Sequence, residues 1–290
     1  MMSGVNVHDP HYRETKPRQG GPTVPLKDLF RLDGRTIIIT GANGFLGVTV
    51  AAMCLESGAD VVALDILEEP STETWAPVQA AAERFKRDLS YHQLDIANDA
   101  DVDAVFEELV STLHHPIRGL VSCAGVSLNG PATEFPVDSF RRLMDINATG
   151  TFAVAQAVAR EMKKADVSGS MVLVASMSGH GSNKGVDTAA YNSSKAAVHQ
   201  LARSLAAEWG SRVGMPLIRV NTLSPGYIRT AATAEALQKP GMESQWTSDN
   251  MLNRLSSVDE FRAPILFLLG DGSSFMTGAD LRVDGGHCAW

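Results

Sequence analysis

Short apolar runs alternate with longer helical patterns along most of this chain, and this alternation constrains the fold more than any other feature. The runs are rich in valine, isoleucine and leucine, as is typical of strands buried on both faces of a parallel sheet. Strands are expected at 35–40, 60–65, 91–94, 119–123, 170–176, 217–223 and 280–283. Helices are expected at 45–57, 71–89, 102–113, 137–164, 188–209 and 258–269, with an irregular stretch over 231–257. The pattern predicts an α/β fold with a doubly wound, seven-stranded parallel sheet and helices on both faces.

These strands and their crossovers use nearly all of the 290 residues, which leaves no room for a second domain. Residues 1–25 differ from the rest because they are polar and contain several prolines and the Gly20-Gly21 pair. We expect 1–25 to form a flexible N-terminal arm, partly ordered against a partner subunit. Residues 26–290 are expected to form one domain that contains every functional site.

Composition excludes several classes of protein. The net charge of −8 argues against a nucleic-acid or anionic-membrane partner. The three cysteines, Cys54, Cys123 and Cys288, are far apart, which argues against a disulfide framework and a structural zinc site. No apolar run approaches the ~20 residues of a membrane helix, and the N-terminus lacks the apolar core of a secretory signal. We therefore expect a cytoplasmic protein with no metal ion.

The glycine-rich turn Thr40–Gly47 lies between the first expected strand and the first expected helix. Glycines allow a tight turn, so that a pyrophosphate can rest on the free N–H groups at a helix N-terminus. Asp65 closes the next strand, where a carboxylate can bind both hydroxyls of a ribose. The position of the turn predicts a dinucleotide site in a Rossmann-type fold, and a glycine-rich connection without a ligand is the alternative.

Asp65 also predicts NAD as the cofactor in preference to NADP. No lysine or arginine occurs between Arg35 and Arg84, and two glutamates follow Asp65 closely. A 2′-phosphate at this place would meet negative charge without a cation nearby in the sequence. Asp95 closes the third strand and is a candidate to accept a hydrogen bond from the adenine amino group. For both carboxylates the alternative is a solvated acid in a turn.

Tyr191 and Lys195 are four residues apart and share one face of an expected helix. A free phenol has a pKa near ~10, so lowering it to ~7 for general-base catalysis takes roughly 4 kcal/mol. One ammonium ~4 Å away supplies about that energy at an effective dielectric constant of ~20, and the positive ring of a bound nicotinamide would add to it. A Tyr-xxx-Lys pair by itself is usually an accident of a helix surface, so the surrounding motifs decide its meaning.

Those motifs make the chain similar to the short-chain dehydrogenase/reductase family, in its single-domain branch, over residues 32–286. The matching pieces are Thr40–Gly47, Asp65, Asp95, Cys123–Gly125, Asn147 within Asp145–Gly150, Ser176, Tyr191 with Lys195, and Ser224–Thr230. The stretch from Met177 to Lys184 is similar to fungal-type polyol dehydrogenases and ketose reductases that act on mannitol, arabinitol, sorbose or xylulose.

The resemblance implies an NAD-dependent oxidoreductase that interconverts a secondary alcohol and a ketone, with a polyol or ketose as substrate. It implies that Tyr191 is the general acid/base and that Ser176 hydrogen-bonds the substrate oxygen. Lys195 would lower the pKa of Tyr191 and bind the nicotinamide ribose, and Asn147 would hold a water that links Lys195 to solvent. The expected cofactor contacts are Gly41, Asn43, Gly44, Phe45, Leu46, Gly47, Asp65, Ile66, Asp95, Ile96, Cys123, Ala124, Gly125, Tyr191, Lys195, Pro225, Gly226, Ile228 and Thr230.

Two residue assignments have alternatives. Ser178 lies 13 residues before Tyr191, the family's commonest separation, whereas Ser176 lies 15 before it. The Ser-x-x-Gly pattern with Gly179 favours Ser176. For His180 the alternatives are a polar group of a loop and a catalytic base. We expect the loop group, since Tyr191 already supplies an acid/base.

The sequence departs from the single-domain branch at two places. Gly41, Gly44 and Gly47 have the spacing of nucleotide-sugar epimerases and dehydratases, whose longer C-terminal lobe this chain lacks. Ser122-Cys123 replaces the family's usual two asparagines and should loosen the hydrogen bonds of the fourth strand. The glycine spacing suggests an NAD-retaining epimerase or dehydratase as one alternative function. A dehydrogenase that tailors a cyclic secondary metabolite is a second, suggested by the apolar residues Met242, Trp246 and Met251, and a non-enzymatic NAD sensor is a third.

The helices expected at 137–164 and 188–209 carry apolar or small residues on more than one face, so each needs a second burial partner besides the sheet. Examples are Ala153, Ala157, Val198, Leu201 and Leu205. In the resembled family these helices pair with their symmetry mates, and a second interface forms near the last strand. The resemblance implies a homotetramer, with a dimer as the alternative, in which Trp290 is buried.

Overall fold

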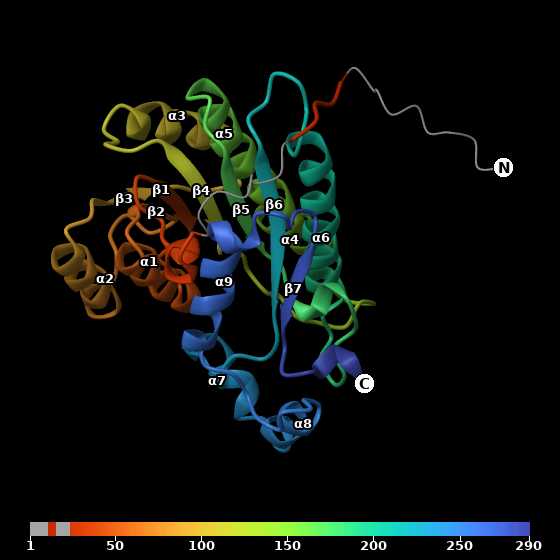
Figure 1. Ribbon diagram of the computed structural model, residues 1–290. Coiled ribbons are helices and arrows are strands. Elements are labelled where there is room, and N and C mark those ends of the chain that lie inside the picture. The colour runs from red at the N-terminus through yellow and green to blue at the C-terminus, as the bar shows by residue number, and fades with distance from the viewer. Residues whose placement is uncertain (1–10, 16–23) are drawn as a thin grey trace.

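A parallel sheet of seven strands runs through the computed structural model, which describes residues 11–15 and 24–290 (Figure 1). The strands are β1 (Thr36–Thr40), β2 (Asp60–Asp65), β3 (Leu89–Gln93), β4 (Ile117–Ser122), β5 (Gly169–Val174), β6 (Ile218–Pro225) and β7 (Asp280–Val283). Their order across the sheet is β3-β2-β1-β4-β5-β6-β7. The direction of winding reverses between β1 and β4, and in such sheets ligands bind beyond the carboxyl ends of the strands at that point. The expected fold class is confirmed.

Helices cover both faces of the sheet, and the sheet separates two hydrophobic cores (Figure 1). They are α1 (Phe45–Glu56), α2 (Thr72–Phe85), α3 (Asp99–Val110), α4 (Val137–Met144), α5 (Thr151–Lys164), α6 (Ala189–Trp209), α7 (Ala231–Leu237), α8 (Met242–Ser248) and α9 (Arg262–Leu269). Ile38 packs with α3, α5 and α6, whereas Ile37 and Ile39 pack with α1 and α9 on the other face. Successive side chains of a strand point to opposite faces, so the continuous β-branched run of β1 fills both cores.

Residues 137–164 do not form the single long helix that the periodicity predicts. A π-helical turn at Asp145–Gly150 separates α4 from α5 and contains Asn147. Gly150 lets this turn lie close to the connection between β3 and α3, since a Cβ at Gly150 would lie 2.7 Å from the carbonyl oxygen of Ile96. Residues within 231–257 were expected to be irregular, but they include the short helices α7 and α8. A π turn inserts one residue without disturbing the apolar pattern on either side, so periodicity does not reveal it.

The described part of the expected arm lies on its own chain. Tyr12 forms an isolated antiparallel bridge with Arg212, and the Arg13 N–H donates to the carbonyl oxygen of Ser211 at 2.8 Å. Residues 11–15 thus contact the connection between α6 and β6 of the same chain. The expected contact of the arm with a partner subunit stays a prediction. The remainder of the expected arm, 1–10 and 16–23, lies outside the described residues. In the described segments, no helix is long and apolar enough to cross a membrane.

Candidate active site

The turn between β1 and α1 is packed backbone against backbone, and this packing explains its glycines. Gly41 has a positive φ of 62°, and a Cβ on it would lie 2.7 Å from the main chain of Ala124, just beyond β4. A Cβ on Gly47 would overlap the carbonyl oxygen of Gly41. The N–H of Asn43 donates to Oδ2 of Asp65 at 2.9 Å, which ties the turn to the end of β2. Only glycine permits this close approach, so the turn forms a cradle of the kind that holds a pyrophosphate.

A cavity of about 430 Å³ lies beside this turn. Its lining consists of Gly41, Asn43, Gly44, Leu64, Asp65, Ile66, Leu67, Leu94, Asp95, Ile96, Cys123, Ala124, Gly125, Val126 and Ile146. Oδ1 of Asp65 accepts a hydrogen bond from the N–H of Leu67 at 3.2 Å, which fixes the carboxylate in the wall. Lysine and arginine are absent from this lining among the described residues. The cavity therefore combines a glycine-rich backbone turn with the carboxylates of Asp65 and Asp95 in one wall.

Several expected cofactor contacts do not line this cavity. Phe45 is 47% exposed at the start of α1, and Leu46 packs against the core cluster on the α1 and α9 face. Gly47 lies buried beneath Gly41 and shapes the turn from below. Asp95 does line the cavity, but its carboxylate already accepts from the N–H of Ala97 at 2.9 Å and pairs with Arg142 at 3.2 Å.

Three of the side chains that the resemblance assigns to catalysis converge beyond the carboxyl ends of β4 and β5. Ser176 caps a short 3-10 turn, Met177–Gly179, with its Oγ accepting from the N–H of Ser178 at 3.1 Å. Tyr191 and Lys195 lie one turn apart on α6, with Nζ of Lys195 5.8 Å from the centroid of the Tyr191 ring. Nζ also donates to the carbonyl oxygen of Val174 at 2.9 Å, which anchors the lysine to the end of β5.

The electrostatics of this group differ from the sequence expectation. Burial raises the pKa of the Tyr191 phenol, while its hydrogen bond with Ser176 acts in the opposite direction. Burial also lowers the pKa of Lys195 to about 8. The expected lowering of the tyrosine pKa by Lys195 is thus not realised in the protein alone, because desolvation penalises the charged forms of both groups. The hydrogen bond to Tyr191 comes from Ser176, which favours Ser176 over Ser178 as the partner of the tyrosine.

Asn147 is brought to the same place by the π-helical turn. Its side chain is 1% exposed, and its Oδ1 accepts from the N–H of Val126 at 2.8 Å. Its Nδ2 donates to the carbonyl oxygen of Val126 and to Oγ of Ser194, both at 2.9 Å. A Cβ on Gly125 would lie 3.1 Å from Oδ1 of Asn147 and 3.4 Å from Nζ of Lys195, so both groups face this glycine. The expected role of Asn147 in holding a water stays a prediction.

The segment that follows β6 is fixed at both ends but lies outside the cavity lining. The N–H of Gly226 donates to the carbonyl oxygen of Val283 at 3.0 Å, which joins the segment to β7. The N–H of Thr230 donates to Oγ1 of Thr233 at 3.0 Å, and the same hydroxyl donates to the carbonyl oxygen of Ile228 at 2.8 Å. The expected nicotinamide contacts of Pro225, Gly226, Ile228 and Thr230 therefore stay predictions.

Cys123 stands where the family usually has asparagine, and it does not loosen the sheet as expected. Its N–H still donates to the carbonyl oxygen of Thr40 at 3.1 Å, which continues the pairing of β1 with β4. Oγ of Ser122 lies 3.4 Å from Oγ1 of Thr40, so the neighbouring position is also tied to β1. Burial raises the pKa of the Cys123 thiol to about 12, so the thiol stays neutral near neutral pH.

Comparisons with known proteins agree with this geometry. Residues 41–287 match a family model described as enoyl-(acyl carrier protein) reductase. The chain is 69% identical to a short-chain dehydrogenase/reductase of Aspergillus versicolor designated notP′, over 100% of this chain and 99% of that protein. This chain belongs to the short-chain dehydrogenase/reductase family.

Two more distant relatives of the family carry more specific names. A D-arabinitol 2-dehydrogenase (ribulose-forming) of Candida albicans is 38% identical, over 90% of this chain and 95% of that protein. The solved structure of an NADPH-dependent 3-quinuclidinone reductase from Rhodotorula rubra is 29% identical and superposes with a TM-score of 0.83. That match covers 95% of this chain and 100% of the other. The chain is therefore an oxidoreductase of this family, with polyol dehydrogenases among its relatives.

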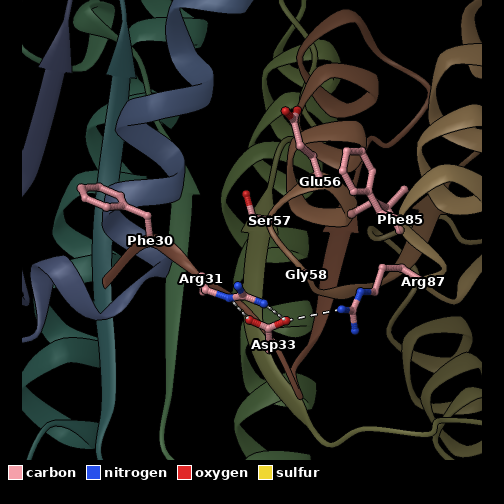
Figure 2. A pocket seen from close by; sticks show the side chains of 9 residues that line it. Phe30, Arg31, Asp33, Glu56, Ser57, Gly58, Phe85 and Arg87 are labelled. Atoms are coloured by element: carbon pink, nitrogen blue, oxygen red, sulfur yellow. Dashed lines mark hydrogen bonds and ion pairs between the residues drawn. The ribbon is translucent and has the colours of Figure 1, made fainter. Parts of the chain in front are cut away.

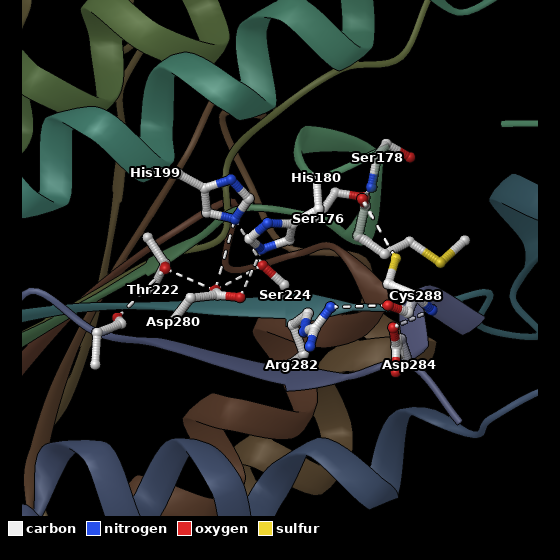
Figure 3. Close-up of polar contacts among 12 residues, drawn as sticks. Ser176, Ser178, His180, His199, Thr222, Ser224, Asp280, Arg282, Asp284 and Cys288 are labelled. Carbon is white, nitrogen blue, oxygen red and sulfur yellow. Dashed lines mark hydrogen bonds and ion pairs between the residues drawn. The ribbon is translucent and has the colours of Figure 1, made fainter. Parts of the chain in front are cut away.

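The structure also assembles a cluster that sequence reasoning missed. His180, expected to be an ordinary loop residue, lies with its Nε2 2.7 Å from Oδ2 of Asp280, and the His199 ring lies beside the His180 ring, with centroids 4.1 Å apart, and also faces this carboxylate (Figure 3). Burial alone would raise the pKa of Asp280, but hydrogen bonds from His199, Thr222, Ser224 and His180 outweigh it and hold the pKa well below its usual range. The three residues are distant in the sequence, so no spacing pattern signals the cluster.

A second cavity, of about 300 Å³, lies at the amino end of β2, away from the dinucleotide turn. Figure 2 shows Asp33 between Arg31 and Arg87 there, with its Oδ1 2.8 Å from Nη2 of Arg31 and 3.4 Å from Nη2 of Arg87. The carboxylates of Asp33 and Glu56 balance the two guanidinium charges in the wall of this cavity. Exposed ion pairs of this kind contribute little to the stability of the fold. We assign no function to this cavity.

The contact between Ser176 and Tyr191 predicts different effects for two neighbouring serines. Ser176→Ala should reduce kcat/KM about 10²-fold or more, a loss of the size seen when one oxyanion donor is removed. Ser178→Ala, which is the matched control two residues on, should stay within a fewfold of wild type. Steady-state rates of cofactor reduction by a polyol measure both, and equal mild losses would show that the assignment of Ser176 is wrong.

Proposed function

We propose that this protein is an NAD(H)-dependent dehydrogenase/reductase that interconverts a secondary alcohol and a ketone, with Tyr191 as the general acid/base. The observation that carries the proposal is the convergence of Ser176, Tyr191 and Lys195 beside a glycine cradle suited to a dinucleotide. A non-enzymatic sensor would need the cradle alone. The same convergence therefore favours catalysis over NAD sensing.

Each side chain would have a distinct task in the reaction. The chemistry that a bound nicotinamide supplies is the acceptance or donation of a hydride. Oxidation of an alcohol also releases a proton from its hydroxyl, and the Tyr191 oxygen would take that proton or return it in the reverse direction. The Ser176 hydroxyl would hydrogen-bond the substrate oxygen, which fixes it beside Tyr191. The positive charge of Lys195 would favour the tyrosinate, against the burial that raises the pKa of Tyr191.

Tyr191→Phe tests this mechanism because it removes only the oxygen that transfers the proton. We expect turnover to fall at least 10²-fold, within the range of losses for general acid–base catalysis. NADH affinity, measured by fluorescence titration, should change less than threefold, because the ring remains. Lys195→Met, by contrast, should weaken NADH binding as well as turnover. Comparable activity in wild type and Tyr191→Phe would rule out the proposed mechanism.

The preference for NAD over NADP is supported by the wall of the cavity around Asp65. Its carboxylate is already held by the N–H groups of Asn43 and Leu67, so it cannot move far from an incoming ribose. A 2′-phosphate would add negative charge beside it, with no lysine or arginine in the described lining to neutralise that charge. One relative is named as an NADPH-dependent quinuclidinone reductase and another as an NADH-dependent L-xylulose reductase, so family membership does not select the cofactor and the proposal rests on the local charge.

We expect wild-type protein to bind NADH at least tenfold more tightly than NADPH in parallel fluorescence titrations. Asp65→Ser combined with Ile66→Arg should reverse the order, because the pair of changes removes the carboxylate and supplies a cation. Glu68→Ser is the matched control, since it removes a nearby acid outside the lining and should leave the preference unchanged. Tighter NADPH binding by the wild type would contradict the proposal.

A polyol or ketose is the substrate class that we favour. The support is the similarity to a D-arabinitol 2-dehydrogenase over nearly the full length of both chains. The second candidate is a cyclic alcohol or ketone. It is supported by the stack of Tyr227 on Trp246, with ring centroids 4.1 Å apart, next to the segment after β6, and by the similarity to a quinuclidinone reductase.

A screen of polyols against cyclic alcohols for NADH formation separates these two substrate classes. It also tests the epimerase or dehydratase suggested by the spacing of Gly41, Gly44 and Gly47. Such an enzyme retains its cofactor and would convert its substrate with no net NADH. Accumulation of NADH with any alcohol therefore favours the dehydrogenase.

We also propose that the protein is a homotetramer. Some residues that suggested a second interface, such as Val198 and Leu205, are instead buried in the chain's own core. Other large apolar side chains remain exposed, including Phe140 and Phe152 on α4 and α5, at 38% and 39%. Phe275 and Trp290, near the two ends of β7, are also exposed, which supports a second interface there.

We propose the cytoplasm as the location of this protein. The free state of all three cysteines fits the reducing conditions of that compartment.

Light scattering coupled to gel filtration should give a mass close to four times the 31.0 kDa of one chain. Phe152→Glu should shift the population toward smaller species, because it places a charge on the exposed face of α5. Glu107→Gln, a surface change on α3, serves as the control. A monomer at micromolar concentration would refute the proposed assembly. A dimer would show that only one of the two proposed interfaces forms, and would therefore contradict the tetramer.

A further inference from the structure

Two imidazoles and one carboxylate meet behind the turn that Ser176 caps, and none of them has a part in the proposed reaction (Figure 3). Nε2 of His180 lies 2.7 Å from Oδ2 of Asp280, and Nε2 of His199 lies 3.5 Å from Oδ1 of Asp280. One donor atom from each residue can be chosen so that all three lie within 4.8 Å of one another. The cluster therefore presents three potential metal donors within one small region.

The three donors come from separate elements and are held in different ways. His199 is on α6 and only 3% exposed, and its ring packs against the backbone of Gly179, where a Cβ would lie 2.7 Å from Nδ1. Asp280 begins β7 and its side chain is 13% exposed. The His180 side chain is 31% exposed, so the cluster is open to solvent on that side. A small ion could therefore reach donors that are otherwise fixed by packing.

Hydroxyl groups support the carboxylate from behind. Oγ1 of Thr222 and Oγ of Ser224 each donate to Oδ1 of Asp280 at 2.7 Å. The Ser224 oxygen also lies 2.7 Å from Nε2 of His199. Outer hydrogen bonds of this kind orient the carboxylate ligands of metal sites, and Ser224 offers a fourth oxygen beside them.

We propose that His180, His199 and Asp280 bind one divalent ion of the zinc class, with the Ser224 hydroxyl or a water as the fourth ligand. Imidazole nitrogens and a carboxylate oxygen are a donor set that suits Zn²⁺. A tetrahedral ion with bonds of about 2.0–2.2 Å separates its donors by roughly 3.3–3.6 Å. The present separations, from 2.7 Å to at most 4.8 Å, bracket that range, so small rotations of the side chains complete the site.

A bound ion would join three segments that surround the active site. His180 follows directly on the turn capped by Ser176, His199 is one turn beyond Lys195 on α6, and Asp280 anchors β7. The ion would act through structure and not in the chemistry. Its binding to the folded state alone should raise the Tm, since a ligand of the native state shifts the unfolding equilibrium.

Calorimetric titration of metal-free, full-length protein with ZnCl₂ tests the site. Wild type should bind one ion per chain, and His180→Asn should bind at least tenfold more weakly. His180 is partly exposed in a loop, so this variant should keep its fold, which near-ultraviolet circular dichroism checks. His114→Asn is the matched control because it removes an exposed imidazole, paired with Asp88, far from the cluster in the sequence. It should bind zinc as the wild type does.

Cobalt substitution identifies the ligands directly. Co²⁺ bound by nitrogen and oxygen in four-fold coordination gives a visible d–d band, which Asp280→Asn should abolish. Three outcomes would overturn the proposal: no zinc uptake by the wild type, equal affinity in wild type and His180→Asn, or a cobalt–thiolate charge-transfer band. In each case His180, His199 and Asp280 would form a hydrogen-bond network only.

Discussion

The close approach of the β1–α1 turn to the end of β4 is the constraint on which the rest of this structure depends. Gly41 lies against the main chain of Ala124, and Gly47 lies against Gly41, so three stretches of backbone meet without side chains between them. This contact lies beyond the carboxyl ends of β1 and β4, at the switch point of the sheet, and the cavity beside Asp65 adjoins it. The spacing of Gly41, Gly44 and Gly47 differs from the usual single-domain pattern, yet it satisfies the same steric requirement.

Burial governs the reactive groups on the other side of that cavity. Lys195 and Tyr191 are both desolvated, which lowers the pKa of the lysine to about 8 and raises that of the tyrosine. A lysine that lies largely out of water is held by the carbonyl oxygen of Val174 at the end of β5. The hydrogen bond to Val174 partly offsets the cost of removing the lysine from water. It also holds Lys195 in place one helical turn from Tyr191.

The C-terminal strand links this site to the cluster behind it. Asp280 at the start of β7 receives hydrogen bonds from β6 and from two histidines, while Val283 at its end accepts from Gly226. β7 thus supports both the turn after Ser176 and the segment after β6. One short strand at the edge of the sheet connects two parts of the molecule that are separated by almost fifty residues of sequence.

The sequence by itself determined the parallel fold, the glycine turn with Asp65 at the next strand end, and the shared helix face of Tyr191 and Lys195, because these depend on local patterns. The place of Ser176 beside Tyr191 was only implied by the family resemblance, and the tertiary structure brings the two side chains together. It did not determine the π turn that presents Asn147, since one inserted residue leaves the apolar periodicity intact on both sides. It also mistook Val198 and Leu205 for interface residues, because a helical pattern does not say which face meets the sheet. The His180, His199 and Asp280 cluster was decided only by tertiary structure. Its members come from a loop, a helix and a strand, and only packing brings such side chains to one point.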